Sequence, residues 1–393
     1  MSNIKMIFLS KLFFFTEDNE LIKDNLRIAD KFYENEVKLT VVAQKSTIRK
    51  LNPLIPESYK EKIGMIDRGS DSKNKVKALK EKGAILGMMG IVDQDAIFSF
   101  NCKIPLFNPE QLSSGRVEIS EKVRNYGLPI IEFQNVIDCL KSYEIHKDNY
   151  FQISFNNQFT VISLNNANTY YRPEEEVRIK EIFETNLKEK DSTRNKRILL
   201  LLLFHLMNEV TTNNHFEDVD YWGSFPSSDL ENTNTSVSFL KEAVRKIVNG
   251  KPKRGPELFI RSTSIKPKHK SRTELRLSNK SDQDFDTLII NPKLINKIEG
   301  KVICIIDDYI TNGYSAETAK HLLFKAGVKR VIFISLGKFE KKYYSTNYVL
   351  EGNVSEEYTY RFINETCYSE SINGKELYNS KNDLDILNFG DFL

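Results

Sequence analysis

The chain has little cysteine, no long apolar run and no excess of charge of one sign. Its 393 residues include four cysteines, which form neither a CxxC pair nor a cysteine–histidine spacing typical of metal sites. This argues against a disulfide scaffold or a zinc site and favours buried, reduced thiols. The longest apolar run, ILLLLLFHLM at 198–207, is half the length that spans a bilayer and predicts a buried helix instead.

The charge balance also restricts the class of protein. With 57 basic and 54 acidic residues the net charge is +3, which does not by itself indicate nucleic-acid binding. The apolar start, MSNIKMIFLSKLFFFTEDNE, is interrupted by Lys11 and lacks a small-residue cleavage site. We therefore expect a first core strand rather than a signal peptide, no membrane segment, and a cytoplasmic protein.

Short apolar runs alternate with amphipathic stretches along most of the chain, a pattern typical of α/β proteins. The length and the pattern together predict two α/β domains, the second with a parallel sheet flanked by helices. A β-rich stretch between them reads as a hairpin closed near Asn156–Asn157. The expected parts are a first domain at 1–145, a connector at 146–172, a second domain at 173–338 and an extension at 339–393.

The stretch VICIIDDYITNGYSAETAKHLLFKAG places two carboxylates side by side after an apolar run. Residues 302–306 are apolar on both faces and predict a central parallel strand that ends at Asp307 and Asp308. A polar loop follows, and then a helix with Ser315 as its N-cap and Gly327 just past its end. Together with RVIFISL this is a βαβ unit, whose ligands bind beyond the carboxyl ends of the strands.

The loop after the acidic pair has the composition of a phosphate-binding site. Consecutive backbone N–H groups would converge at a helix start, where the macrodipole favours an anion, and Gly313 permits close approach. Each neighbouring carboxylate can accept a hydrogen bond from a sugar hydroxyl, and Mg²⁺ nearby would reduce their repulsion. We predict that Asp307 and Asp308 hold a sugar diol and the metal. The residues predicted to bind the phosphate are Thr311, Asn312, Gly313, Tyr314 and Ser315.

The acidic pair also fits two other interpretations. Phosphoacceptor receiver domains also place acidic residues at a strand end, where they hold a metal, but they need a further aspartate after a later strand. VIFISLGK supplies none. In the simpler alternative, the aspartates only cap a helix.

VICIIDDYITNGYS resembles the phosphoribosyl-pyrophosphate (PRPP) motif of type I phosphoribosyltransferases, an apolar strand followed by two acids and a Thr/Gly loop. The resemblance implies that the acids bind the ribose hydroxyls and that Thr311 to Ser315 bind the 5-phosphate. Asn312 stands where the family usually has a second threonine. The implied reaction exchanges the pyrophosphate at ribose C1 for a nitrogen nucleophile, or the reverse, with Mg²⁺ and charge stabilisation of the leaving group.

A second candidate loop lies upstream in DVDYWGSFPSSD, where a short apolar strand precedes a polar turn containing proline. In the resembled family an equivalent loop meets the pyrophosphate with main-chain amides. The positions that match it here are Ser224, Ser227, Ser228 and Asp229.

The segment between the two loops, residues 251–276, carries nine lysines or arginines against two glutamates. Such a run is usually a solvated face, and nucleic-acid contact is a less favoured alternative. Its place between two ligand loops, however, suits cations that meet a diphosphate. The stretch LFIRSTSIKPKHKSRTELRLSN also resembles competence-associated (ComF-type) phosphoribosyltransferase-like proteins. The ligand-contacting candidates, with Arg272 the catalytic one, are Arg261, Lys268, His269, Arg272 and Arg276.

The first domain resembles a haloacid-dehalogenase-like (HAD-like) domain in the order of its segments. Its nucleophile is missing, because Ser10 and Leu12 stand where the family has two acids, and serine cannot form the aspartyl-phosphate intermediate. We expect a catalytically inactive recognition or scaffolding module, or else an ordinary α/β domain. The residues that match the remaining motifs are Lys73 or Lys75, and Asp93 with Asp95.

Three functions are consistent with these motifs. The first is an enzyme, a phosphoribosyltransferase acting on PRPP or a nucleotide. The second is a non-catalytic regulator that senses PRPP or a nucleotide. The third is an effector of a bacterial stress, competence or phage-defence system. Analogy with other PRPP-site domains, which often pair, suggests a homodimer.

Overall fold

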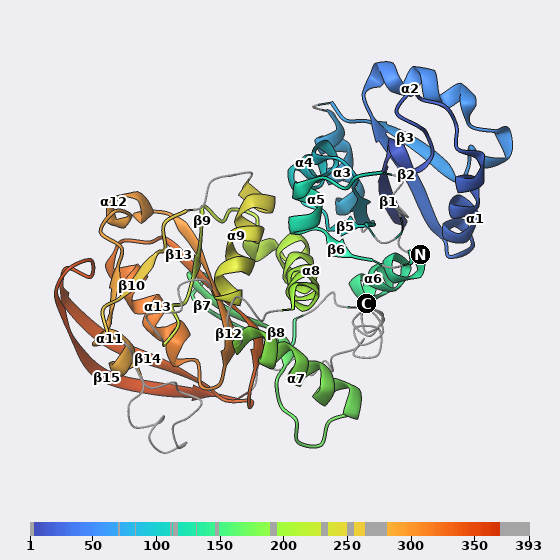
Figure 1. The fold of residues 1–393 in the computed structure, drawn as a ribbon. Coiled ribbons are helices and arrows are strands. Elements are labelled where there is room, and N and C mark those ends of the chain that lie inside the picture. Colours follow the sequence, from blue (N-terminus) through green and yellow to red (C-terminus); the bar gives the residue numbers. More distant parts are fainter. Residues whose placement is uncertain are drawn as a thin grey trace. The chain divides into compact units, whose positions relative to one another are not determined.

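The computed structural model describes residues 4–69, 71–82, 84–110, 112, 117–130, 132–145, 149–188, 195–228, 235–249, 255–263 and 281–369. The chain divides into two compact units, one built mainly from Met1–Lys147 and the other from Asp148–Arg245 and Lys251–Ser380. Each unit has its own β-sheet flanked by helices (Figure 1), so the predicted α/β class is confirmed. Among the described helices, none is both long and apolar enough to cross a bilayer.

The first unit is a six-stranded, all-parallel sheet in the order β3-β2-β1-β4-β5-β6. Its strands are β1 Lys5–Ser10, β2 Val37–Ala43, β3 Ile63–Asp67, β4 Ile85–Met89, β5 Leu106–Asn108 and β6 Leu128–Pro129. Its helices are α1 Leu26–Glu34, α2 Lys45–Leu51, α3 Asp71–Glu81, α4 Asp93–Cys102, α5 Glu121–Tyr126 and α6 Phe133–Ile145.

Helices cover both faces of this sheet because its central strands are apolar on both sides. Phe32 of α1 packs edge-on against Phe133 of α6 with ring centroids 5.9 Å apart, whereas α3, α4 and α5 pack against one another. Gly87 of β4 provides the space for a neighbouring ring, since a Cβ there would lie 2.7 Å from Cε2 of Phe107. The sheet is therefore a doubly wound layer with its core on both sides.

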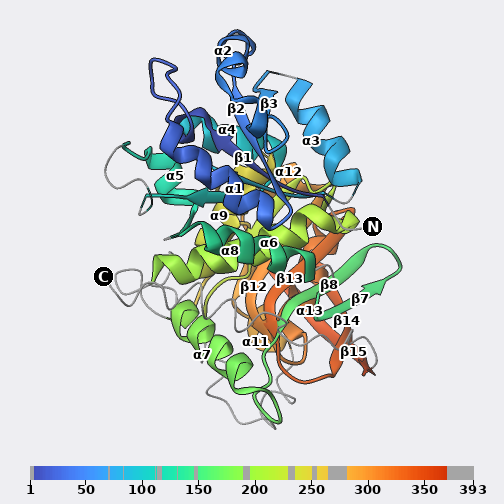
Figure 2. The same ribbon diagram turned by 90° about the vertical axis from the view of Figure 1, so that its right-hand side faces the viewer.

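The second unit is a five-stranded sheet in the order β7-β8-β13-β12-β9, parallel except for the edge strand β7. Figure 2 shows β8, β13 and β12 side by side. The strands of this sheet are β7 Phe151–Phe155, β8 Phe159–Asn166, β9 Tyr221–Ser224, β12 Val302–Ile310 and β13 Arg330–Lys338. Two antiparallel pairs lie outside it: β10 Phe259–Arg261 with β11 Leu288–Ile290, and β14 Tyr343–Gly352 with β15 Tyr358–Tyr368. The helices are α7 Glu174–Lys188, α8 Lys196–Thr212, α9 Ser236–Asn249, α11 Asp282–Phe285, α12 Ile295–Ile298 and α13 Tyr314–Lys325.

The predicted hairpin exists, and it belongs to this sheet rather than to a separate connector. Asn156 and Asn157, in the three-residue loop between the paired Phe155 and Phe159, have positive φ angles of 50° and 56°, a conformation that asparagine adopts in tight turns. The second strand, β8, then pairs in parallel with β13 over 172 positions of sequence separation, as the bond between Ser163 and Ser335 illustrates (2.6 Å). The segment at 151–166 therefore supplies two of the five strands.

A long hairpin that the sequence did not predict, β14–β15, covers part of α13. The buried Glu317 of α13 fixes it, because its carboxylate accepts hydrogen bonds from the Tyr343 hydroxyl (2.6 Å) and the Thr346 amide (2.8 Å). Lys320, one turn along the helix, pairs with the same carboxylate. Burial beside Glu317 raises the pKa of the Tyr343 hydroxyl, so that hydroxyl stays a donor.

We expect Glu317→Ala to lower the free energy of unfolding of the second unit by about 3 kcal/mol, because buried donors lose their acceptor and Lys320 loses its counter-ion. Trp222, the only tryptophan of the sequence, is 2% exposed in this unit, so its fluorescence during denaturation reports on this unit. The exposed Glu356, replaced by alanine, is the control and should cost less than about 0.5 kcal/mol. Equal losses of unfolding free energy in the two variants would contradict the role of Glu317 as the acceptor that fixes the β14–β15 hairpin.

Candidate functional site

The acidic pair lies inside a strand, not beyond its end. The sequence predicted that the strand ends at Asp307, but β12 continues to Ile310 and pairs with β13 up to Lys338. The extension forms because β13 also continues past its apolar part, and Phe339 N–H then bonds to the Ile310 carbonyl (2.8 Å). The predicted loop is therefore short, from 311 to 313, and α13 begins at Tyr314.

This position reduces the repulsion between the two acids. Successive side chains of a strand point to opposite faces, so neighbouring carboxylates diverge. Asp307, buried at 9% exposure, accepts the Asp308 amide (2.9 Å), and the half-buried Asp308 accepts the Tyr309 amide (2.6 Å). Hydrogen bonds that each carboxylate receives from a backbone amide partly offset its desolvation.

The loop at 311–313 directs its carbonyl groups into the protein. The Thr311 carbonyl accepts from Nζ of Lys338 (2.6 Å), the Asn312 carbonyl from Tyr344 N–H (2.9 Å), and the Gly313 carbonyl from Glu317 N–H (3.0 Å). Within the described residues, no protein acceptor receives the N–H groups of Thr311, Asn312 or Gly313. Consecutive amides without protein acceptors at a helix start are groups to which an anion can bind.

Gly313 is the N-cap of α13, with φ 90° and ψ 0°, and Ser315 lies inside the helix instead of capping it. The side chain of Tyr343 covers Gly313 on one side, since a Cβ at this position would lie 2.6 Å from Cδ2 of the ring. Only glycine satisfies both the left-handed conformation and the close ring. At the other end of α13, Gly327 has φ 78° just past the last turn, as predicted.

The second candidate loop begins beside the acidic pair. β9 pairs with β12 as far as Ser224 opposite Ile306, and the amide of Phe225 bonds to the Ile306 carbonyl (2.9 Å). The loop therefore leaves the sheet one position before Asp307. Ser227 and Ser228 are partly exposed in it, whereas Asp229 lies outside the described residues.

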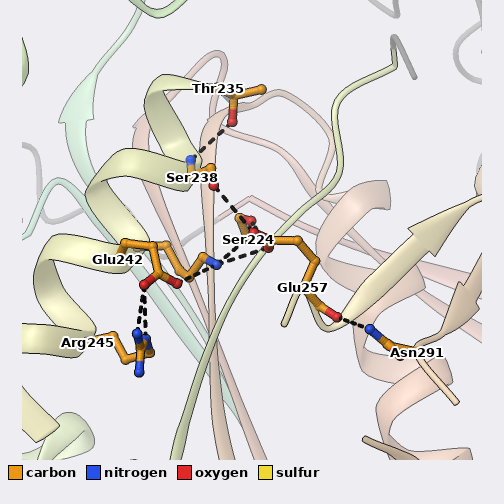
Figure 3. Close-up of polar contacts among 8 residues, drawn as sticks. Ser224, Thr235, Ser238, Glu242, Arg245, Glu257 and Asn291 are labelled. Carbon is orange, nitrogen blue, oxygen red and sulfur yellow. Dashed lines mark hydrogen bonds and ion pairs between the residues drawn. The ribbon is translucent and has the colours of Figure 1, made fainter. Parts of the chain in front are cut away.

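A network of charged groups supports the base of this loop (Figure 3). The Ser224 hydroxyl donates to Glu257 (3.1 Å), and the buried Lys241 of α9 donates to both oxygens of that carboxylate (2.9 and 3.0 Å). Lys241 also bonds to Glu242, which pairs with Arg245 (2.7 Å). The cations of Lys241 and Arg245 thus balance the carboxylates of Glu242 and Glu257. The hydrogen bond to Glu257 fixes the orientation of the Ser224 hydroxyl.

Arg261, a predicted ligand cation, is buried in an internal ion pair. Its guanidinium bonds to Asp284 (3.1 Å), Thr287 (2.6 Å) and the Ser227 carbonyl (3.0 Å) at 7% exposure. In this position it holds the second loop, and its five donors are mostly used. Lys268, His269, Arg272 and Arg276 lie outside the described residues.

The described residues before and after 264–280 are attached to the two candidate loops. Before this stretch Arg261 bonds to the Ser227 carbonyl, and after it the described chain resumes at Ser281. Ser281 is fully buried, and its hydroxyl donates to the Tyr314 carbonyl (3.2 Å) at the start of α13. β10, which precedes residues 264–280, and β11, which follows them, pair antiparallel. Arg261 is thus fixed to the second loop and Ser281 to the start of α13.

The front unit carries a different arrangement at its β1 and β4 ends. The fully buried Asp95 accepts the amides of Ile91 and Val92 (3.0 Å each) and pairs with Arg68 (2.7 Å), which follows β3. Burial raises the pKa of Asp95, and the Ser10 hydroxyl is among the groups that lower it.

The other HAD-like motif positions lie elsewhere. Asp93 pairs with Lys122, and Lys75 pairs with Asp71 on exposed α3 (2.9 Å), where it lines a hollow against the sheet. Lys73 belongs to the same helix. Among described contacts, neither lysine bonds to Asp95, so the structure shows an acid and an arginine at the strand ends, not a lysine and two acids.

Comparison with protein-family models and with curated proteins gave no match. The residues themselves therefore carry the functional argument.

Several residues of the site were missed from the sequence. Tyr343, Glu257 and Ser281 act through contacts between distant segments, for which the sequence holds no local signal. Lys338 did leave a signal, a single lysine that ends an otherwise apolar strand, VIFISLGK. It is fully buried, and burial lowers its pKa to about 8.

Gly313→Ala tests the close approach of Tyr343, with Gly300→Ala as the matched control. Both glycines have positive φ, 90° and 66°, but nothing lies within 4 Å of a Cβ at Gly300. The control should lose about 1 kcal/mol of unfolding free energy from backbone strain, and Gly313→Ala about 2 kcal/mol more from the overlap with the ring. Tryptophan fluorescence during denaturation measures both, and equal losses would show that the ring yields freely.

Arg68→Met should destabilise the front unit in a pH-dependent way, with the exposed-pair variant Arg124→Met as control. Without Arg68 the buried Asp95 resists ionisation more strongly, so its pKa rises further above the ordinary carboxyl value. Stability is then retained in acid and lost as pH rises through that pKa. Hydrogen exchange in peptides from β4 and α4 should show a loss of about 3 kcal/mol at pH 7.5 and less at pH 5. A pH-independent loss would contradict this account.

Proposed function

We propose that the second unit binds a phosphorylated sugar of the PRPP type and transfers its phosphoribosyl group to, or releases it from, a nitrogen nucleophile. The observation that carries the proposal is the loop at 311–313, whose carbonyl groups are all held by the protein while its N–H groups have no protein acceptor among the described residues. A bound phosphate would satisfy them.

The neighbouring groups fit the rest of such a ligand. Asp307 and Asp308 lie in the last half of β12, just before the loop at 311–313, and a carboxylate there can accept a hydrogen bond from a ribose hydroxyl. The loop with Ser227 and Ser228 follows Ser224, the last residue of β9, which lies opposite Ile306 of β12, the residue before Asp307. We expect this loop to bind the pyrophosphate. The sequence between Arg261, which bonds to the second loop, and Ser281, which bonds to the start of α13, is rich in lysine and arginine, residues that suit a diphosphate.

Magnesium fits this donor set in one way. Within the described residues no group of three or more His, Cys, Asp or Glu side chains converges, and the candidate ligands among them are Asp307 and Asp308. Mg²⁺ commonly keeps several waters and binds through one or two carboxylates plus substrate phosphates. When bound, it would neutralise charge on the diphosphate. The chain's own residues would orient the ribose and hold the 5-phosphate away from water.

The alternative is a regulator or defence effector that binds PRPP or a nucleotide in the same pocket without turnover. The two functions share the pocket and differ in chemistry, so binding and turnover are measured separately. The enzyme would release pyrophosphate in the presence of a nitrogen acceptor, and the regulator would not.

Calorimetric titration of the full chain with PRPP and Mg²⁺ should show binding, and Asp307→Asn and Asp308→Asn should each weaken it about tenfold or more, since each loses a charge-assisted hydrogen bond. Glu356→Gln removes an exposed carboxylate of the same unit and should change nothing. Pyrophosphate release with a panel of amines and bases then decides between enzyme and regulator. No binding by the wild-type chain would overturn the proposal.

A further inference from the structure

Lys338 is a buried cation for which no described carboxylate serves as partner. It ends β13 at 0% exposure, and its Nζ donates to the carbonyl groups of Thr311 (2.6 Å), Phe339 (3.2 Å) and Lys342 (2.8 Å). The ammonium also lies 5.0 Å from the centre of the Phe151 ring. An ammonium has three N–H donors, and here each has a carbonyl acceptor. Burying such a charge is costly, so its retention needs an explanation.

The three carbonyl groups show what the ammonium holds together. One belongs to the candidate phosphate loop, and the other two belong to the turn between β13 and β14, whose next residues place Tyr343 over Gly313. Lys338 thus joins the loop to the turn that covers it. A carbonyl that faced the ligand would repel a phosphate oxygen, and the bond to Lys338 turns that of Thr311 away.

We infer that Lys338 is a positioning residue of the phosphate loop, which keeps the Thr311–Gly313 amides directed at the ligand and makes phosphate binding depend on its own protonation. The inference rests on the proposed function for its ligand, but its effect on the loop is independent of any ligand.

The pH dependence follows from the number of donors. Burial lowers the pKa of Lys338 to about 8, and a neutral amine has two N–H donors and no charge, so it can hold two carbonyl groups at most. Phosphate binding should therefore weaken as pH rises through about 8. Unfolding stability should change in the opposite sense, because between the folded pKa and the ordinary lysine value the unfolded chain binds more protons.

Several titratable groups lie around Lys338. Glu340, next to it, favours the charged form. Burial raises the pKa of Tyr309 on β12 and of Tyr343 on β14, so both stay neutral through pH 9.5. The acids on packed elements are Asp307 and Asp308 of β12 and Glu184 of α7; although burial opposes it, hydrogen bonds from Lys180 and Lys188 lower the pKa of Glu184. Lys180 also lies over the Phe339 ring, 5.3 Å from its centre. A phosphate monoester has its second pKa near 6 and is fully charged.

Three variants of the full chain separate the causes. Lys338→Met keeps the length of the side chain without the donors, Lys338→Arg keeps a charge that does not titrate, and Lys329→Met removes an exposed lysine before the same strand as the control. The first readout needs no ligand: hydrogen exchange of a peptide covering residues 311–320 should be faster in Lys338→Met than in wild type, and unchanged in Lys329→Met.

The second readout is calorimetric affinity for PRPP with Mg²⁺ between pH 7 and 9.5. Wild type should bind about tenfold more weakly at pH 9.5 than at pH 7, and Lys338→Met should bind about 10- to 100-fold more weakly at pH 7. Lys338→Arg and Lys338→Met should both lose the decline above pH 8, whereas Lys329→Met should keep it.

The outcomes distinguish this inference from the proposed function. If wild type binds no PRPP but Lys338→Met still loosens the loop, the proposed function fails and the positioning role stands. Unchanged loop exchange in a folded Lys338→Met overturns the positioning role even if PRPP binds. If Lys338→Met does not fold, the wild-type pH profile and its loss in Lys338→Arg decide, and a flat wild-type profile overturns the inference.

Discussion

The geometry of the candidate site depends on three backbone carbonyl groups that face into the protein. Those of Thr311, Asn312 and Gly313 are held by donors from three different elements, β13, β14 and α13. A loop free of such bonds would satisfy its own amides with nearby carbonyl groups, and none would remain for a ligand. Because the donors are separated in sequence, the loop acquires its shape only when the sheet, the helix and the hairpin are all in place.

Unlike charges meet at the same edge of the sheet, and each is stabilised differently. Asp307 and Asp308 accept backbone amides within their own strand, whereas Lys338 donates to carbonyl groups of the loop after β12 and of the turn between β13 and β14. The edge therefore offers acceptors on β12 and N–H donors in the loop that follows it. A ligand that carries both hydroxyl donors and phosphate acceptors complements this arrangement, whereas a purely anionic or purely cationic one would meet a like charge.

The periodicity of apolar residues predicted the elements that carry the site, but not their ends or their partners. β12, α13 and β13 were expected because VICII and RVIFISL are continuously apolar and AETAKHLLFKAG has helical spacing. The extra length of β12 was missed since Asp, Tyr and Thr also suit a loop, and only pairing with Gly337 and Lys338 favours the strand. β14–β15 was missed for the same reason, in a stretch rich in Tyr, Ser and Asn.

Charge in a sequence predicts a cation but not its partner, and Arg261 shows the consequence. It lies within the basic segment 251–276, yet its guanidinium donates to Asp284, to Thr287 and to the Ser227 carbonyl. The buried pair with Asp284 makes this arginine an anchor, since breaking it would leave a charge without a counter-ion. Ser281 has a comparable role at the start of α13, where its hydroxyl donates to the Tyr314 carbonyl. Arg261 therefore acts on the candidate site through the Ser227 carbonyl that it holds, a role that depends on partners distant in sequence and that the basic composition of its surroundings does not reveal.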